Sequence, residues 1–319
     1  MAESFFRAFS QTFVAISEVA LIVAAAWILV ARGVISQAAI KGLSDLTVLV
    51  FLPCLMFADI LSTLNPAEQK LWWILPLLGL LMFVGGGLIG VLVMWPSVKQ
   101  KRDLIPLASM QNAAFLALPI GQALVPRDFD RFALYCFLFL IIYSPLFWSV
   151  GKFLNTAGSS SLLSWRSLVS PPLIANLVAV ALVLTGAKAF VPEPVVAATK
   201  LLGSATVPAA TFVLGGALGG MEHQFRKHLG DALRSQAVKL LIIPLVTVLI
   251  LRATNIRQTD PTLALVMVLQ GATPPATNIM LQIKTYGGNL ERSGTIMLLG
   301  YIAALFTIPA WVAIWEVLR

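Results

Sequence analysis

The hydrophobic positions of the chain fall into long blocks that are separated by short polar or turn-prone connectors. A helix needs about 20 consecutive apolar residues to cross a bilayer, and ten blocks come close to this length or exceed it. They lie near residues 13–31, 43–64, 72–95, 104–125, 132–153, 168–187, 195–220, 236–253, 262–284 and 294–316. The pattern predicts an all-α integral membrane protein with ten transmembrane helices.

Composition and charge change this picture only by adding an orientation. Of the residues, 59% are hydrophobic and 11% are charged, whereas a soluble domain carries about 25% charged residues. The net charge of +8 does not indicate nucleic acid, because the basic residues lie in the connectors and act as topology signals. The basic connectors alternate along the chain, which predicts a multi-pass protein of the plasma membrane (a bacterial inner membrane) with both termini outside.

Two segments of the first half recur in the second half at one constant offset. Lys41–Val48 lines up with Lys200–Val207, and Gln111–Ala113 lines up with Gln270–Ala272 in the same register without a gap. The alternative is that helices rich in Leu, Ala and Val align by chance. A true repeat of five spans inserts its second copy upside down, as in many transporters. The predicted units are residues 1–153 and 168–319, joined by a cytoplasmic connector at 154–167.

The fourth and ninth predicted spans carry polar and helix-breaking residues at equivalent positions. Pro removes a backbone N–H donor and clashes with the preceding turn, so adjacent prolines interrupt a helix. Two broken helices that cross at mid-membrane would present half-helix N-termini, which suit an anionic group. The alternative is that these residues only kink packed helices. The predicted substrate site consists of Gln111, Asn112, Ala113 and Pro119 in the fourth span, and of Gln270, Thr273, Pro274, Pro275, Thr277 and Asn278 in the ninth.

Four ionisable residues fall within predicted spans, where charge is costly and often functional. Asp45 and Lys239 lie near the cytoplasmic ends, so we expect their side chains to reach the interface and to be structural. Glu18 and Asp59 lie deeper and are candidates for proton coupling. Neither crossing span carries a carboxylate, which argues against a sodium/proton antiporter.

Four motifs together resemble the auxin efflux carrier family, which includes the plant PIN auxin exporters and small bacterial carriers of organic anions. They are Phe51–Phe57, Asn112 followed by Pro119, Ser170–Asn176, and Ala272–Asn278 continuing to Tyr286–Asn289. The resemblance implies ten helices, a scaffold and a transport unit, and elevator-like movement. It also implies that Asn112 is the family's fourth-helix Asn and that Pro119 and Pro275 are its crossover prolines.

The function predicted on these grounds is secondary active transport of a small organic anion, a carboxylate, by alternating access. No cofactor or metal is expected, and the coupling ion is H⁺ or Na⁺. Membrane lipid and the organic anion are the expected partners, nucleic acid is not, and a homodimer formed through the scaffold is compatible with the pattern. Two alternatives stay open, namely a sodium-coupled symporter of the bile-acid type and a membrane receptor with the same fold. An intramembrane enzyme is disfavoured, because the sequence carries no His-Glu zinc motif, no suitable pair of aspartates and no acidic cluster for a diphosphate.

Overall fold

The computed structural model describes residues 2–95, 97–155, 169–221, 224–254 and 256–318. Within these ranges the chain is helical, with short 3₁₀ and π segments, and its only β-bridge is an isolated pair between Gln111 and Pro275. Most of the predicted connector at 154–167 lies outside the described residues.

The helices follow one another along the chain with short connections. Those of the first half are α1 (Ala2–Ala31), α2 (Gln37–Leu46), η1 (Thr47–Phe51), α3 (Leu52–Thr63), α4 (Ile74–Met94), η2 (Ser97–Lys99), α5 (Leu104–Ser109), α6 (Ala117–Leu124), η3 (Pro126–Asp128), α7 (Phe129–Leu146), η4 (Phe147–Gly151) and α8 (Lys152–Asn155). Those of the second half are α10 (Pro171–Leu184), η5 (Ala187–Phe190), α11 (Glu193–Gly203), α12 (Thr206–Gly219), α13 (Phe225–Ala237), η6 (Val238–Ile242), α14 (Ile243–Arg252), α15 (Ile256–Thr259), α16 (Pro261–Ala272), α17 (Asn278–Tyr286) and α18 (Leu290–Val317).

Seven continuous helical stretches among the described residues are long and apolar enough to cross a membrane. They correspond to the predicted first, second, third, fifth, seventh, eighth and tenth spans. The sixth is the shorter helix α10, and the fourth and ninth are each divided into two helices, α5 with α6 and α16 with α17. A multi-pass membrane protein is therefore supported, while the count of ten crossings stays a prediction.

Two spans begin about ten residues earlier than their hydropathy predicted. Helix α1 starts at Ala2, because Phe5, Phe9 and Phe13 stack one turn apart and extend the apolar stripe of the helix. Helix α13 starts at Phe225, where its polar residues form the first turns of a continuous helix that runs on into α14. Both helices therefore extend beyond the apolar run by which hydropathy identifies a span.

Large apolar side chains cover much of the outer surface. Leu21, Leu81 and Leu92 are 71%, 65% and 75% exposed, respectively. A soluble protein of this size does not leave so many large apolar side chains in water, whereas lipid tails accept them. The exposed faces of α1 and α4 therefore fit a bilayer.

Helix α1 lies between α12 and α18, and small residues let two of these helices come close. A Cβ atom at Gly219 would lie 2.7 Å from the carbonyl oxygen of Trp27, and one at Gly215 would overlap the carbonyl oxygen of Val23. Such close backbone approach is typical of packing inside membranes, where small residues replace the hydrophobic effect as the source of tight contact.

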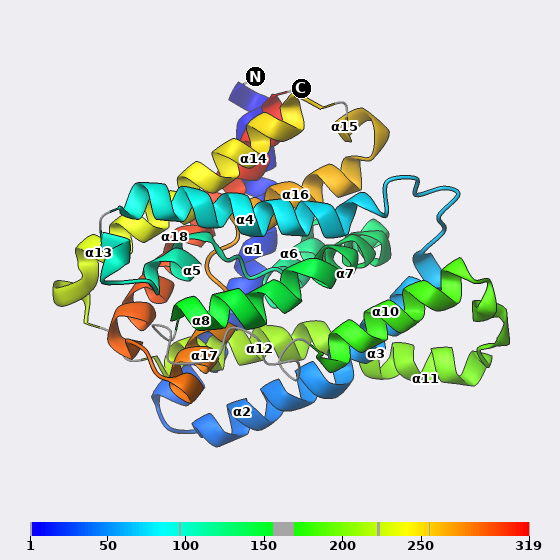
Figure 1. Ribbon diagram of the computed structural model, residues 1–319, viewed down its shortest axis with the longest axis horizontal. Helices are drawn as coiled ribbons and strands as arrows, with labels where there is room; N and C mark the ends of the chain where they lie inside the picture. The colour runs from blue at the N-terminus through cyan, green and yellow to red at the C-terminus, as the bar shows by residue number, and fades with distance from the viewer. Residues whose placement is uncertain (1, 96, 156–168, 222–223, 255, 319) are drawn as a thin grey trace.

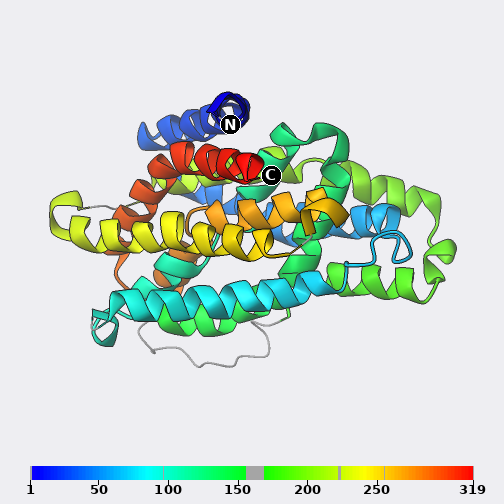
Figure 2. The ribbon, with the colours of Figure 1, turned by 90° about the horizontal axis from the view of Figure 1, so that it is seen from above.

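The connections gather at two ends of the molecule. Those at 64–73, 185–192 and 256–260 lie toward the right and upper right of Figure 1, whereas those at 32–36, 97–103 and 287–289 lie toward the left. The two termini lie near each other, and α1 and α18 run side by side in both views (Figures 1 and 2). Termini on the same side of a membrane require an even number of crossings, which is compatible with the predicted ten.

Candidate functional site

The two broken spans meet through their backbones. After α5 ends at Ser109, the backbone N–H of Asn112 donates to the backbone carbonyl of Pro274 (2.9 Å). The backbone N–H of Ala276 donates to the backbone carbonyl of Met110 (3.1 Å). These bonds flank the bridge between Gln111 and Pro275. The unwound backbone groups of each span are thus partly satisfied by the other span, which is how broken helices are tolerated at membrane depth.

Buried side chains join the same two segments a second time. The side-chain amide of Asn112 donates to the hydroxyl of Tyr301 (2.7 Å), and this hydroxyl donates to the backbone carbonyl of Pro275 (2.9 Å). The amide of Gln270 donates to the carbonyl of Ala113 (2.9 Å). Asn112, Gln270 and Tyr301 are all buried. Tyr301 on α18 therefore ties both breaks to a continuous helix.

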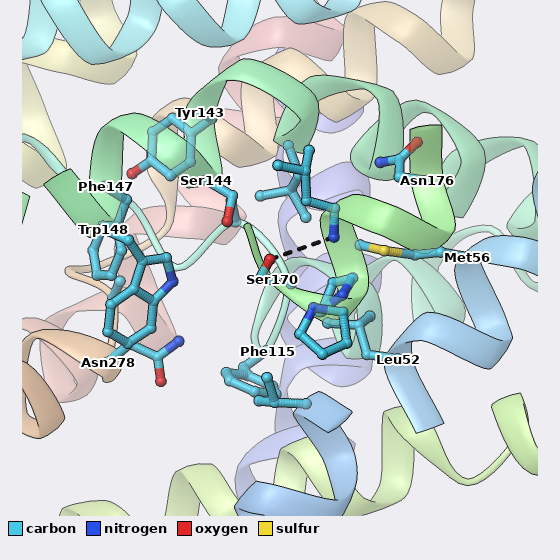
Figure 3. Close-up of a pocket in the computed structure, with 18 of the residues that line it drawn as sticks. Leu52, Met56, Phe115, Tyr143, Ser144, Phe147, Trp148, Ser170, Asn176 and Asn278 are labelled. Atoms are coloured by element: carbon cyan, nitrogen blue, oxygen red, sulfur yellow. Dashed lines mark hydrogen bonds between the residues drawn. The ribbon is translucent and has the colours of Figure 1, made fainter. Parts of the chain in front are cut away.

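A cavity of about 330 Å³ opens beside this crossover. In Figure 3, Asn278 and Trp148 appear on one side of the cavity, and Met56 and Asn176 on the other. None of the described residues that line it carries a charge. They are Val48, Leu52, Met56, Gln111, Asn112, Ala113, Ala114, Phe115, Leu140, Tyr143, Ser144, Phe147, Trp148, Val169, Ser170, Pro171, Pro172, Leu173, Asn176, Ala276 and Asn278.

Gln111 is the most unusual polar residue of the cavity. It is 1% exposed, and neither its amide nitrogen nor its amide oxygen has a hydrogen-bond partner among the described residues. The side-chain oxygen of Asn176 is unpartnered in the same way, while its nitrogen donates to the carbonyl of Phe137. Buried polar groups are nearly always paired, and exceptions often mark a site that a ligand completes.

The predicted site residues divide into two groups. Gln111, Asn112, Ala113 and Asn278 line the cavity. The others lie at the crossover or on its helices without lining the cavity, and all are buried: Pro119, Gln270, Thr273, Pro274, Pro275 and Thr277. This second group shapes the break, because Pro274 and Pro275 interrupt the helix and Thr277 stands at the start of α17.

Sequence reasoning missed the wall that α7, η4 and α10 contribute. Tyr143, Ser144 and Trp148 come from the fifth span, and Ser170 and Asn176 come from the start of the sixth. Two signals were available, namely the polar pair Tyr143–Ser144 before Pro145 in an apolar run, and Asn176 within the family-like motif. Neither signal tells which way a side chain faces.

The ionisable residues are placed differently from one another. Asp59 is 2% exposed, with one carboxylate oxygen unpartnered among the described residues, whereas Glu18 is exposed on α1. Neither lines the cavity. Asp45 is exposed and pairs with Lys41 at 3.2 Å, as expected of a residue near the interface. Lys239 does not reach the interface, so that prediction was wrong: it is fully buried, and its ammonium group donates to the carbonyl of Gly271 (2.9 Å).

Comparison with known proteins decides the family. The family model described as "Membrane transport protein" matches residues 11–312, which is nearly the whole chain. The chain belongs to this family. It is the auxin efflux carrier family that the motifs resemble, so the resemblance is confirmed. A family of membrane transporters also fits a protein that is not an enzyme.

A plant relative supports the same assignment. Protein PIN-LIKES 5 of Arabidopsis thaliana is 29% identical over 126 residues. The match covers 35% of this chain and 29% of the plant protein, so the two are similar over less than a third of that relative's length. Its name indicates a relation to PIN proteins and assigns no substrate to this chain.

Proposed function

We propose that this protein is a secondary active carrier of a small organic carboxylate, which binds in the cavity beside the crossover. The observation that carries the proposal is the unpartnered amide of Gln111, buried in an uncharged cavity where two broken spans of a transporter-family protein meet. An amide that lacks partners in the ligand-free protein can hydrogen-bond a carboxylate without first breaking a bond.

The N-terminal ends of two helices near the cavity favour a negatively charged ligand. Helices α6 and α17 begin at Ala117 and Asn278, beside the cavity residues Phe115 and Ala276. The helix dipole makes the N-terminal end of each helix positive. Two such ends with the amides of Gln111 and Asn112 favour an anion over a cation, although no Lys or Arg among the described residues lines the cavity.

The proposed architecture is ten spans in two inverted repeats, residues 1–153 and 168–319, with both termini outside a bacterial plasma membrane. The adjacent termini and the grouping of the connections support it (Figure 1). Elevator-like movement of a transport unit against a scaffold follows from the family resemblance. Lipid surrounds the apolar faces, and a homodimer through the scaffold is part of the same proposal.

Of the two carboxylates considered for proton coupling, Asp59 is the better candidate, because it is buried and incompletely hydrogen-bonded. Uptake driven by a pH gradient is the measurement. We expect Asp59→Asn to abolish the gradient effect, and Glu18→Gln, an exposed control, to keep it. Unchanged pH dependence in both variants would remove proton coupling through these residues.

The test of the carrier function is counterflow in proteoliposomes with a panel of labelled organic anions. We expect one class of carboxylate to exchange, Asn112→Ala to abolish the exchange, and Gln111→Met to weaken it. Gln100→Met is the matched control, because Gln100 is exposed near the connection that follows α4. Binding without flux would favour a receptor, and flux indifferent to both cavity variants would place the site elsewhere.

A further inference from the structure

Helix α16 ends in a way that leaves two carbonyl groups without their usual donors. In an α-helix the N–H of a residue donates to the carbonyl four positions earlier. The donors for Gln270 and Gly271 would come from Pro274 and Pro275, which have no N–H. Both carbonyls lie in a fully buried segment. Leaving them unpaired at membrane depth would cost several kcal/mol each.

The chain supplies two replacement donors of different kinds. The hydroxyl of Thr273 donates to the carbonyl of Gln270 at 3.3 Å. The ammonium group of Lys239, from the neighbouring helix, donates to the carbonyl of Gly271 at 2.9 Å. A neutral hydroxyl serves one position, whereas a positively charged group serves the other. The equivalent break after α5 differs, since neutral donors, Tyr143 and Gln270, reach the carbonyls of Gln111 and Ala113 there.

The position of Lys239 depends on two local features. It lies in the π segment Val238–Ile242, and such wider turns redirect side chains and are frequent at functional sites. Gly271 lets the neighbouring span come close, because a Cβ atom there would lie 2.9 Å from the hydroxyl oxygen of Thr247. Lys239 is 0% exposed, and no ion pair joins it to a carboxylate within the ranges that the structure describes.

A buried cation without a carboxylate partner needs another source of negative potential. The C-terminal end of a helix carries a partial negative charge, and its last carbonyl groups point outward. In transporters with broken helices these carbonyl groups coordinate the coupling cation. In this protein the ammonium group of Lys239 donates to the carbonyl of Gly271, to which a free cation could otherwise bind.

We propose that the ammonium group of Lys239 is a built-in cation that holds the break of α16, in the place that a bound sodium ion would otherwise take. The inference rests on the proposed carrier function and deepens it, because it removes sodium from the transport cycle. Lys239 is a positioning residue, because it acts through Gly271 and the prolines that follow it. The carbonyl of Pro274 in turn accepts the backbone N–H of Asn112. Its charge also lowers the cost of bringing an anion to the crossover.

The first experiment uses the wild-type protein. Counterflow of the transported carboxylate is measured with sodium and with choline as the only added cation. In parallel, thermal unfolding in detergent is followed in both media by tryptophan fluorescence, which needs no substrate. We expect equal flux and equal melting temperatures. Sodium-dependent flux, or a melting temperature that rises in sodium, would overturn the proposal.

The second experiment changes the residue. We expect Lys239→Ala to lose at least about tenfold in flux in choline, equivalent to ~1.4 kcal/mol. Sodium or methylammonium should restore part of it and raise the melting temperature of this variant alone. Lys239→Arg should keep most of the flux, and Lys41→Met, at an exposed lysine, should behave as wild type. A folded Lys239→Ala variant with normal flux in choline, or one that neither ion rescues, would overturn the proposal.

The two arms separate this inference from the carrier function itself. If no organic anion exchanges in any medium, the carrier function fails, and the melting temperatures still decide whether a cation site is present. If Lys239→Ala does not fold, the sodium comparison of the wild type and the flux of Lys239→Arg decide the role of the charge. A variant Lys239→Arg that folds but carries nothing would also count against the proposal, because its charge is kept.

Discussion

Replacing Gln111 by Met is expected to stabilise this protein while weakening its binding of the transported carboxylate. Both polar atoms of the Gln111 side chain are buried and unpartnered among the described residues. Burying an amide without hydrogen bonds costs roughly 1–3 kcal/mol. Met has a similar length and no polar group, and it fills irregular space well. The variant should therefore raise the free energy of unfolding by about 1–3 kcal/mol.

The same change should weaken the binding of the substrate. A hydrogen bond to a charged group contributes about 1.5–3 kcal/mol, so the affinity for the carboxylate should fall by about 10- to 100-fold. The unfolding free energy is measured by equilibrium titration with denaturing detergent, followed by tryptophan fluorescence. Affinity is measured from the concentration dependence of counterflow. Gains in stability with losses in function are common where a binding site holds groups that only the ligand satisfies.

Gln270→Met is the matched control for this reasoning. Gln270 has the same side chain and the same degree of burial, but its amide nitrogen donates to the carbonyl of Ala113 at 2.9 Å, and only its amide oxygen lacks a partner among the described residues. Removing this donor leaves a buried carbonyl unpaired, so the variant should lose about 1–3 kcal/mol of stability. The opposite signs of the two variants are the test. If Gln111→Met is destabilised as much as Gln270→Met, or if it carries substrate normally, the interpretation of Gln111 as a ligand group is wrong.

Three further predictions concern contacts that hold the crossover and its surroundings. Tyr301→Phe should lower the free energy of unfolding by about 1–3 kcal/mol and slow counterflow, because the hydroxyl joins Asn112 to Pro275; unchanged stability would show that this link is dispensable. Asp103→Asn should cost about 3–5 kcal/mol in the same unfolding assay, since it leaves the largely buried guanidinium of Arg292 without its bidentate partner; a loss below about 1 kcal/mol, typical of exposed pairs, would contradict this. Gly271→Ala should lower the melting temperature and impair flux, because the new Cβ meets Thr247 at 2.9 Å; an unaltered melting temperature would mean that the two spans separate easily.

The sequence alone predicted the seven continuous spans and the breaks in the fourth and ninth spans. Hydropathy identifies a stretch that must lie in lipid, since length and lack of charge suffice for this. The break in the ninth span was predictable for a similarly local reason, because Pro274 and Pro275 cannot donate hydrogen bonds. Asn112 and Asn278 were found in the same way, as amides in apolar surroundings. The lengths of α1 and α13 were underestimated, because the polar and charged residues in their first turns interrupt the apolar run although the backbone there is already helical.

What the sequence by itself determined is thus a helical membrane protein with two interrupted spans and a candidate anion site. Only the tertiary structure decided which polar groups share one cavity and which of them lack partners. Tyr301 and Lys239 illustrate the difference, because their partners, Pro275 and Gly271, lie on another span. Their roles depend on how helices pack side by side, and helical periodicity fixes the face of a residue only relative to its own helix. A lysine that local position assigned to the interface therefore proved to be fully buried beside the break of α16.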